Sequence, residues 1–389
     1  MRSNWSSGQL GELCQIVNGG TPKTGIAKYW NGDHLWITPA EMGKRLSPYV
    51  GETERKLTDL GLQNSSARLL PPCSVILSSR APIGHLVINT LPMATNQGCK
   101  GLIPKDRLDS KYLYYYLAAN VELLNSLGTG ATFKELSGAR LREVSIRFPS
   151  LAEQRRIVGI LDKAFDAIAV AKANTEKNLQ NARALLAFHM ESAFSGEGRP
   201  WPLEAIGNLT HLARGHNPPK SKFSRQPKKG YIRFYQIRDG KSDDHAVYVP
   251  DSPQLHKMEM DDIMMVAYRH IGRVFRGVSG AFNVALCKIR NTRKDLLHDD
   301  YLFQIIPTKY VKGELLKRSE RSLIPSMSIE HLREVKIPLP PLSEQIRIVK
   351  RNEDFSAKVK YLEDTYKRKA QSLEELKESL LHEAFTGTL

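Results

Sequence analysis

The sequence predicts an α+β fold in which two globular domains are separated by two long antiparallel α-helices, with an internal pseudo-two-fold symmetry. The 18 residues LREVSIRFPSLAEQRRIV from Leu141 return as LREVKIPLPPLSEQIRIV from Leu332, with 12 of the 18 positions identical. A long stretch of helical periodicity follows each copy. The excess positive charge lies in the two segments that precede the copies. A tandem duplication of one domain and one helix accounts for all three observations.

Each copy leads into a predicted long helix, at residues 149–196 and 340–389. Apolar residues recur there at the spacings of three and four that an amphipathic helix requires. They are Leu151, Ile157, Ile160, Leu161, Ala164, Phe165, Ile168, Leu179, Ala182, Leu185 and Leu186, then Phe355, Val359, Leu362, Tyr366, Leu373, Leu376 and Leu380. The stops Ala193-Phe194-Ser195-Gly196 and Ala384-Phe385-Thr386-Gly387 match, and each places a glycine where helices favour one at the C-terminus.

The two helices are expected to pack against each other as an antiparallel pair, because neither has enough globular sequence of its own to cover so long an apolar stripe. The alternative is that each helix packs separately on its neighbouring domain. An antiparallel pair would relate the two halves of the chain by an approximate two-fold axis.

The globular domains are predicted at residues 1–148 and 197–339, with fainter repeats between them. At a constant offset of 196, the matching residues are Trp5, Gly11, Leu13, Gly19 and Pro22 with Trp201, Gly207, Leu209, Gly215 and Pro218. SSRAPIGHL from Ser78 resembles AYRHIGRV from Ala267 if one residue is deleted, which pairs Arg80 with Arg269. Strand-like segments such as SVILSS, HLVI and YIRFYQI predict α+β domains.

The charge distribution favours nucleic acid as the partner of both domains. The chain carries a net charge of +16. Residues 1–147 hold 17 Lys and Arg against 11 Asp and Glu, and residues 197–338 hold 25 against 16, so these segments carry +6 and +9. The segments 148–196 and 339–389 carry +1 and zero. Basic domains separated by neutral helices are typical of two DNA-binding domains joined by a spacer.

Other classes of protein fit the sequence less well. No apolar run reaches the length that spans a bilayer, and the first residues lack a signal-peptide core, so a cytoplasmic protein is expected. The four cysteines lie far apart without histidines at ligand spacing, so we expect buried thiols and no metal site.

The doubled P-x-L-x-EQ-x-x-IV unit, with a variable region before each copy, resembles the specificity subunit of type I restriction-modification systems. The resemblance covers essentially the whole chain. It implies that the basic segments are target recognition domains that bind double-stranded DNA and that the chain is not itself an enzyme. It also implies that the chain docks two methyltransferase subunits, and often two restriction subunits. S-adenosylmethionine, ATP and Mg²⁺ are then expected on those partners, with no cofactor bound by this chain.

Two other functions remain open at this stage. A self-sufficient DNA methyltransferase is suggested only by Asn217-Pro218-Pro219-Lys220. Adenine methyltransferases need an aromatic fourth residue to stack on the flipped base, and Lys220 cannot stack in that way. A standalone coiled-coil DNA-binding regulator is the second alternative. No GxxxxGK[ST] phosphate loop is present, which argues against an ATPase.

The candidate DNA-binding residues are basic or polar side chains near the repeated landmarks, because Arg and Asn can pair bidentately with bases and Lys more often meets phosphate. They are Lys23, Lys44, Arg45, Ser79, Arg80, Asn96, Lys220, Lys222, Arg225, Arg238, Tyr268, Arg269 and Asn283. Each could instead be an ordinary surface residue. For partner docking the candidates are Glu153, Gln154, Glu344 and Gln345; their alternative role is to favour the helix N-termini.

Overall fold

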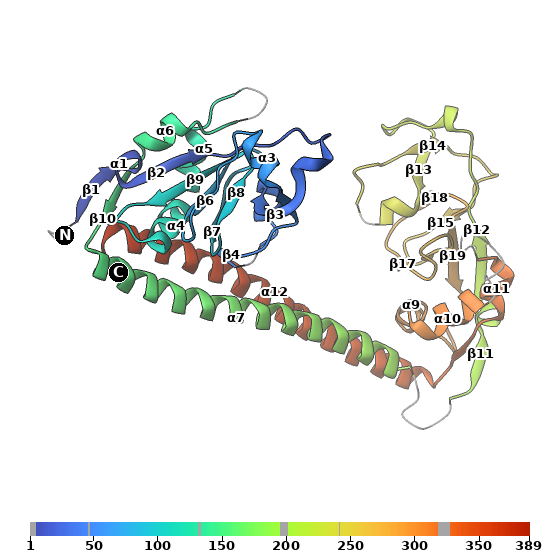
Figure 1. Cartoon of the computed structure of the whole chain (residues 1–389). Helices are drawn as coiled ribbons and strands as arrows, with labels where there is room; N and C mark the ends of the chain where they lie inside the picture. The colour runs from blue at the N-terminus through green and yellow to red at the C-terminus, as the bar shows by residue number, and fades with distance from the viewer. Residues whose placement is uncertain (1–4, 46, 131–133, 195–200, 241, 318–326) are drawn as a thin grey trace. The chain divides into compact units, whose positions relative to one another are not determined.

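The computed structural model describes the chain except for residues 1–4, 46, 131–133, 195–200, 241 and 318–326. It divides into two compact units (Figure 1). Unit 1 comprises residues 1–175 and 367–389, and unit 2 comprises residues 176–366. Each unit therefore contains one globular domain and a part of both long helices, α7 (Leu151–Ser192) and α12 (Leu342–Thr386).

The domain of unit 1 is built around two sheets. Among the described residues, one sheet has the strand order β2-β9-β6-β7-β4 and another the order β5-β3-β8. The strands are β1 Ser6–Gln9, β2 Cys14–Asn18, β3 Trp30–Ile37, β4 Tyr49–Val50, β5 Arg55–Leu57, β6 Val75–Ser79, β7 Ile83–Asn89, β8 Met93–Thr95, β9 Cys99–Pro104 and β10 Ser145–Phe148. The helices are α1 Leu10–Leu13, α2 Pro39–Met42, α3 Asp59–Gln63, α4 Ser110–Ala119, α5 Val121–Ser126 and α6 Gly138–Glu143.

The domain of unit 2 repeats this plan with shorter elements. Its described sheets have the orders β12-β19-β16-β17 and β14-β13-β18-β15. The strands are β11 Leu203–Ala205, β12 Thr210–Arg214, β13 Tyr231–Tyr235, β14 Tyr248–Pro250, β15 Lys257–Met258, β16 Ile263–Val266, β17 Val274–Phe275, β18 Gly280–Phe282, β19 Leu286–Asn291 and β20 Lys336–Pro338. The helices are α8 Ile206–Leu209, α9 Asp299–Ile305, α10 Lys309–Lys317 and α11 Ile329–Glu334. Both domains are α+β, as the sequence predicts.

The repeated opening of each domain packs on the repeated Leu-Arg-Glu-Val segment. In unit 1, β1 pairs antiparallel with β10, and in unit 2, β11 pairs with β20 in the same way. The arginines Arg142 and Arg333 lie on Gly11 and Gly207. A Cβ at Gly11 would lie 2.9 Å from Cβ of Arg142, and one at Gly207 would lie 2.1 Å from Cγ of Arg333. The repeated glycines are therefore needed for close packing.

Within each unit, α7 and α12 run antiparallel and contact each other. In unit 1, Lys172 bonds to Glu374, and the Lys377 ammonium lies 5.5 Å from the ring centre of Phe165. In unit 2, Arg183 Nε donates to Glu363 at 2.8 Å, and the rings of His189 and Phe355 stack at 4.1 Å. These contacts confirm the predicted antiparallel pair and exclude two helices that pack separately.

The helix ends close the hydrophobic cores of both domains. The first turns of α7 and the last turns of α12 enter the core of unit 1, where Phe385 meets Tyr112 at 5.2 Å between ring centres. The residues that follow α7 enter the core of unit 2 in the same way, where the ring centres of Phe194 and Tyr301 lie 5.3 Å apart. Gly387 has φ +84, which confirms its predicted role in ending α12. Ser195 and Gly196 of the first stop lie outside the described residues.

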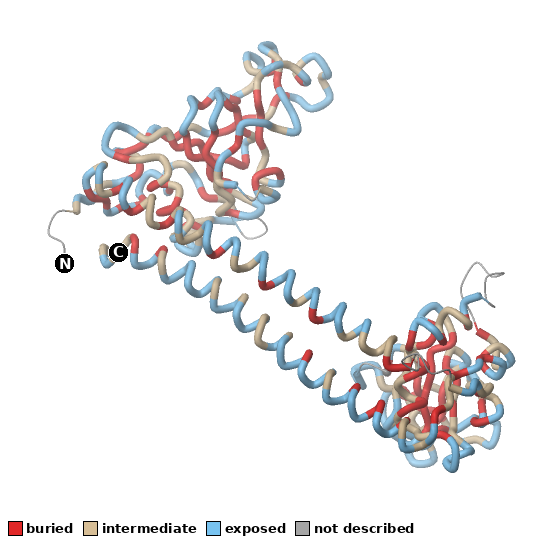
Figure 2. Tube along the Cα trace, turned by 90° about the horizontal axis from the view of Figure 1, so that it is seen from below, coloured by how far each residue is buried: buried red, intermediate tan, exposed pale blue. Residues whose placement is uncertain are grey.

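The apolar stripe on the helices is less fully covered than its spacing predicts (Figure 2). Ile157, Leu161 and Val359 are buried, in agreement with the prediction. Leu185, Leu362 and Leu376 were expected on the same stripe, but they are 55%, 40% and 47% exposed. For these three positions the expectation is wrong, because two helices cover only part of a wide stripe.

Two further expectations concern membranes and thiols. In the described part of the chain, no helix combines the length and apolar character that crossing a membrane requires. Cys14, Cys99 and Cys287 are buried, and burial raises the pKa of each thiol to about 12. Cys73 is exposed, so the expectation of a buried thiol is wrong there.

Candidate nucleic-acid interface

Two loops of the first domain are joined by backbone hydrogen bonds. Gly19 N–H donates to the Cys99 carbonyl at 3.1 Å, and Gly20 N–H donates to the Thr95 carbonyl at 2.8 Å. Asn96 N–H donates to Ile37 at the end of β3, and its Oδ1 accepts from Gly98 N–H at 2.6 Å. The loop that carries Lys23 is thus held beside the loop that carries Asn96.

The second domain repeats this framework bond for bond. Gly215 N–H donates to Leu286 O at 3.3 Å, and His216 N–H donates to Phe282 O at 3.1 Å. Asn283 N–H donates to Tyr235 O at the end of β13, and its Oδ1 accepts from Ala285 N–H at 3.2 Å. Asn96 and Asn283 are therefore structurally equivalent. Because each amide oxygen already holds its own loop, the geometry gives both residues a structural role first.

The glycines of this framework are fixed by close approach of two backbones. A Cβ at Gly19 would lie 1.9 Å from the Asn96 carbonyl oxygen, and one at Gly215 would lie 2.1 Å from the Asn283 carbonyl oxygen. No side chain fits at such distances. This explains why Gly19 and Gly215 recur at a constant offset while the residues around them differ.

The loop after β6 also has an equivalent, but the predicted alignment is wrong. Ser79 O accepts from Leu136 N–H at 2.8 Å, and Ala267 O accepts from Met327 N–H at 3.1 Å, so Ser79 corresponds to Ala267. The next positive φ angles fall at Ala81, with φ 50, and at Arg269, with φ 61. The loops therefore align without a deletion. Arg80 corresponds to Tyr268, and its predicted pairing with Arg269 is wrong.

Most of the other predicted DNA-binding side chains lie on or beside these loops. Lys23 is exposed in the first domain, as are Lys220, Lys222, Arg225 and Arg269 in the second. Arg269 lies 5.7 Å from the ring centre of the half-buried Tyr268. Asn217 Oδ1 accepts from Val284 N–H at 3.2 Å, which ties the segment before Lys220 to the Asn283 loop.

Three predicted cations are paired with acidic groups of their own segments, and one predicted hydroxyl is buried. Lys44 Nζ lies 3.0 Å from Glu54, and Arg45 lies 2.8 Å from Glu41. Arg238, which is about half exposed, has its Nε 4.0 Å from Asp239. Ser79 is fully buried. Its side chain is therefore not available on the surface, and the prediction that it contacts DNA is wrong.

Sequence reasoning missed two charged residues beside Arg80. Lys100 on β9 is only 6% exposed, and its Nζ lies 3.9 Å from Glu135. Glu135 also lies 3.7 Å from Arg80. A signal was present in the sequence, because Lys100 interrupts an apolar strand. Its counterpart in the second domain is Cys287, since Cys287 bears the same relation to Asn283 as Lys100 does to Asn96.

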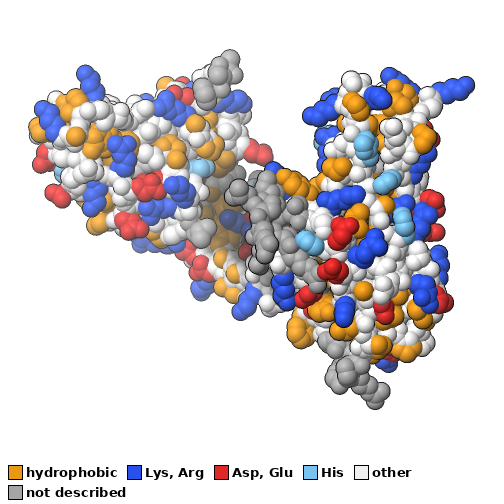
Figure 3. Space-filling view, turned by 90° about the vertical axis from the view of Figure 1, so that its right-hand side faces the viewer, with side chains coloured by type: hydrophobic (Ala, Val, Ile, Leu, Met, Phe, Trp, Pro, Cys, Tyr) orange, Lys and Arg blue, Asp and Glu red, His pale blue; other side chains and the backbone are white. Residues whose placement is uncertain are grey.

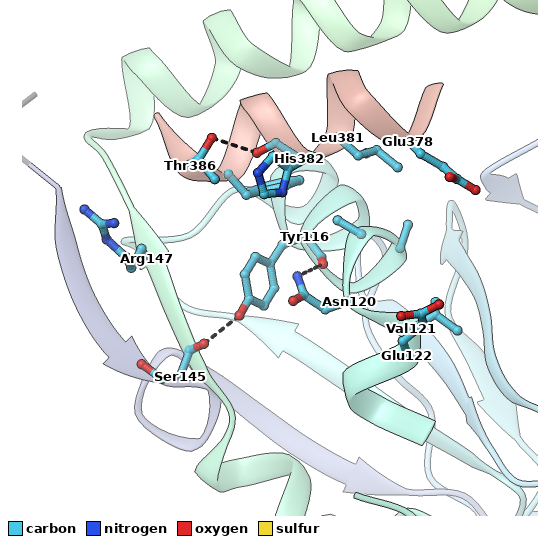
Figure 4. A pocket seen from close by; sticks show the side chains of 13 residues that line it. Tyr116, Asn120, Val121, Glu122, Ser145, Arg147, Glu378, Leu381, His382 and Thr386 are labelled. Atoms are coloured by element: carbon cyan, nitrogen blue, oxygen red, sulfur yellow. Dashed lines mark hydrogen bonds between the residues drawn. The ribbon is translucent and has the colours of Figure 1, made fainter. Parts of the chain in front are cut away.

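A hollow of about 750 Å³ in unit 1 lies where the end of α12 meets α4, α5 and β10 (Figure 4). Tyr116 Oη donates to the Ser145 carbonyl at 2.6 Å, and Asn120 Nδ2 donates to the Tyr116 carbonyl at 2.7 Å. None of the predicted DNA-binding residues is among its lining residues. The hollow is therefore part of the contact between the end of α12 and the domain, and we do not assign it to the DNA interface.

The glutamine and the glutamate of the repeated Glu-Gln pair differ in burial and in their contacts. Gln154 is fully buried: its Oε1 accepts from Asp109 N–H at 2.8 Å, and its Nε2 donates to the carbonyls of Arg107 and Pro149 at 2.9 Å. Gln345 makes the same three bonds at 2.8 Å, from His298 N–H and to Leu296 and Pro340.

These bonds lock the start of each long helix to its domain. A buried amide cannot contact a partner, so the docking assignment of Gln154 and Gln345 is wrong. Glu153 and Glu344 are partly exposed and pair with Arg156 and Arg347. Docking by these two glutamates stays a prediction.

We expect Gln345→Leu to lower the free energy of unfolding by about 1–3 kcal/mol, because a buried N–H and two carbonyls lose their partner. Urea unfolding of the full chain measures the change. The matched control is the neighbouring Ile346→Gln, which is half exposed and should change stability by less than about 0.5 kcal/mol. Equal effects of the two substitutions would show that Gln345 does not lock the helix.

A family model described as the type I restriction modification DNA specificity domain matches residues 2–181 and, a second time, residues 199–370. The two matches cover most of the chain. The chain belongs to this specificity family. Its double match also agrees with the duplication that the hydrogen-bond framework shows.

Relatives agree with this membership, and solved structures share the fold. The MjaIX specificity subunit of Methanocaldococcus jannaschii is 26% identical over 368 residues, which cover 87% of this chain and 83% of the relative. The EcoR124I/EcoR124II specificity subunit of Escherichia coli is 32% identical over 166 residues, 41% of this chain and 40% of the relative.

Among solved structures, the HsdS subunit from Thermoanaerobacter tengcongensis is 18% identical, with a TM-score of 0.68 over 100% of this chain and 98% of that one. A chain from a structure on complex assembly and conformational transition of the type I system is also 18% identical. Its TM-score is 0.79, over 100% of this chain and 99% of that one. At this identity the likeness shows the shared fold.

As a type I specificity subunit, the chain is the DNA-recognition component of its complex and is non-catalytic. The Asn217-Pro218-Pro219-Lys220 segment agrees with this. The Asn217 amide oxygen is bonded to the Asn283 loop, and a 3-10 helix at Lys220–Lys222 follows the prolines. The segment is a turn of the specificity subunit. Neither a self-sufficient methyltransferase nor a standalone regulator receives support.

Proposed function

We propose that this specificity subunit reads a two-part target in double-stranded DNA, with one half-site for each domain and an unread spacer between them. The repeated framework around Asn96 and Asn283 carries the proposal, because it presents the same set of loops twice on one chain. The charge supports it: the segments that contain the two domains carry the positive excess. Figure 3 shows Lys and Arg side chains scattered over the visible face of unit 2, among acidic and apolar ones.

The two domains should read different sequences through equivalent loops. Arg80 can pair bidentately with guanine, whereas its counterpart Tyr268 offers a single hydroxyl and an aromatic face. The exposed lysines Lys23, Lys220 and Lys222 suit phosphate contacts, which position a domain without reading sequence. The two half-sites are therefore expected to be unrelated in sequence.

We expect Arg80→Ala to relax discrimination at one base position of one half-site by about 1–3 kcal/mol, and to leave the other half-site unchanged. Selection of bound duplexes from a random library measures this. Lys23→Ala is the control, because loss of a phosphate contact should weaken all sequences about equally. A uniform loss with Arg80→Ala would make Arg80 a phosphate contact as well.

The helices are proposed to dock two methyltransferase subunits, and restriction subunits where the system has them. S-adenosylmethionine, ATP and Mg²⁺ would act on those partners. Exposed apolar side chains support this and are themselves repeated. Leu185 and Tyr361 are 55% and 68% exposed in unit 2. Their counterparts 191 positions away, Leu376 and Val170, are 47% and 62% exposed in unit 1. Equivalent patches on both units suit two copies of one partner.

In unit 2 the exposed leucines Leu185 and Leu362 lie on the same side of the helix pair. Leu185 follows the buried Ala182 by three residues, and Leu362 follows the buried Val359 by three. Three residues turn a helix by about 300°, so each leucine is displaced by about 60° in the same sense from the facing position. Because the helices are antiparallel, equal senses of rotation place both leucines on the same face.

Phe188 and Tyr361 are 70% and 68% exposed. We expect the double substitution Phe188→Glu with Tyr361→Glu to weaken binding of the methyltransferase subunit by about 30-fold or more, which corresponds to the loss of about 2 kcal/mol that a single aromatic anchor often contributes. DNA binding by the chain alone should not change. Sedimentation of the mixed subunits measures assembly. Lys360→Glu, a charge change on an exposed residue of the opposite flank, is the control. Unchanged assembly in the double variant would remove this face from the docking surface.

A further inference from the structure

The first domain holds polar groups at positions that the second domain fills with apolar ones. Lys100 pairs with Leu77 between β9 and β6, and Cys287 pairs with Met265 between β19 and β16. Lys100 is 6% exposed and Cys287 is fully buried. The fold accepts an apolar residue at this position, so packing does not require a lysine there. Burial lowers the pKa of Lys100, and Glu135 opposes that shift.

The same contrast holds two residues along the strand from Leu77. Ser79 corresponds to Ala267, and both are fully buried. Among the described residues, Ser79 Oγ is buried without a hydrogen-bond partner. Alternation along β6 places Ser79 on the same face of the sheet as Leu77 and therefore as Lys100. The first domain thus has a lysine and a serine at these two positions, where the second domain has Cys287 and Ala267. The second domain instead has Arg214 of β12 paired with Cys287, and the Arg214 guanidinium donates to Met327 O at 2.7 Å.

Glu135 joins Lys100 to Arg80. Its Oε1 lies 3.9 Å from Lys100 Nζ, and its Oε2 lies 3.7 Å from Arg80 Nη1. The backbone of Glu135 is fixed by two hydrogen bonds with Thr129, at 2.9 and 3.0 Å. The neighbouring Leu136 N–H donates to Ser79 O at 2.8 Å. The backbone that carries this carboxylate is thus tied to β6. The Glu135 side chain is 44% exposed and lies between a buried cation and one that is 36% exposed.

A guanidinium that a neighbouring carboxylate keeps in one orientation is well suited to recognise a base. Bidentate recognition of guanine needs the planar fork of Arg in a defined orientation, and a free Arg side chain loses more conformational entropy on binding. Arg80 is close to the Asn96 loop: a Cβ built on Gly98 would lie 3.1 Å from Arg80 Nε and 3.0 Å from Asn96 Oδ1. Glycine at position 98 keeps this approach open.

We propose that Lys100 and Glu135 are specificity-determining positioning residues of the first half-site: Lys100 holds the Glu135 carboxylate, and Glu135 orients the Arg80 guanidinium that reads a base. This rests on the proposed function, in which Arg80 contacts DNA. The second domain has Tyr268 and Cys287 at the corresponding positions, so this device acts on one half-site only.

The test is selection of bound duplexes from a random library with the purified full chain, comparing Glu135→Gln and Lys100→Met with wild type. Both variants should relax the same base position that Arg80→Ala relaxes, by about 10-fold, which corresponds to 1.4 kcal/mol. The second half-site and the salt dependence should stay as in wild type, because neither residue contacts phosphate. Asp59→Asn, which removes the partner of His34 on the surface of the same domain, is the matched control and should leave the motif intact.

The results distinguish a positioning role of Glu135 from a purely structural one. An unchanged motif in Glu135→Gln, or a uniform loss of affinity across all sequences, overturns the positioning role while the two-part motif of the wild type still stands. Thermal unfolding of each variant identifies a uniform loss that comes from misfolding, and Lys100→Met then decides alone, since Cys287 shows that this position accepts an apolar residue. A wild-type chain that selects no two-part motif overturns the proposed function itself.

Discussion

Raising the salt concentration from about 50 to about 200 mM should weaken DNA binding by this chain by about 10³- to 10⁵-fold, if its two domains together contact six to ten phosphates. The reason is counterion release: each neutralised phosphate adds about −0.9 to the slope of log K against log salt. The positive charge of +6 and +9 on the two domain-containing segments makes several contacts for each domain reasonable. Fluorescence anisotropy with a duplex measures the slope.

A pair of variants makes this measurement specific to the proposed interface. Lys220→Ala with Lys222→Ala should reduce the magnitude of the slope by about 1.8 if both contact phosphate. Arg293→Ala, which removes a cation already paired with Asp295 at 2.7 Å, should leave it nearly unchanged. A flat titration of the wild type would contradict binding to nucleic acid through the basic domains.

Four helix-forming residues inserted after Asn174 in α7, together with four after Ser372 in α12, should lengthen the preferred spacer by about one or two base pairs. Four residues add about 6 Å and turn each helix by about 400°, so the facing stripes stay within about 40° of register. Both helices need the insertion because each is anchored at both ends, through Gln154 and Phe385 in unit 1 and through Gln345 and Phe194 in unit 2.

Two-residue insertions at the same points are the control. They turn each helix by about 200° and direct the stripe away from its partner, so they should damage folding or activity. The readout is the spacer in methylated sites from cells that make each variant with its methyltransferase. An unchanged spacer in the four-residue variant, or altered half-sites, would show that the helices do not set the separation.

The helices and the duplication could be predicted because their signals are local and repeated. Periodicity defines α7 and α12, and an apolar stripe too long for one domain to cover leads to antiparallel pairing. The framework glycines could also be identified from the sequence, because they recur at a constant offset. The structure gives the reason: a Cβ at Gly19 or Gly215 would lie about 2 Å from backbone atoms. Both copies therefore have glycine at this position, although the residues around it differ.

Residue roles are harder to predict wherever they depend on tertiary contacts. A sequence alignment pairs Arg80 with Arg269 because the residues are identical. In the structure the positive φ angles of Ala81 and Arg269 show that these two residues are equivalent, so Arg80 corresponds to Tyr268. Gln154 looks available for docking because sequence does not show that the backbone of Arg107 and Asp109 lies against the helix start. Glu135 gives no signal because its partner Arg80 is 55 positions away.

Mapping methylated adenines in DNA from cells that make this specificity subunit with its methyltransferase tests the central proposal most directly. We predict a two-part motif: two unrelated half-sites separated by a spacer of constant length and arbitrary sequence. Arg80→Ala should then change one half and leave the other half and the spacer intact. A single continuous motif, or a spacer of variable length, would contradict recognition by two domains of one chain.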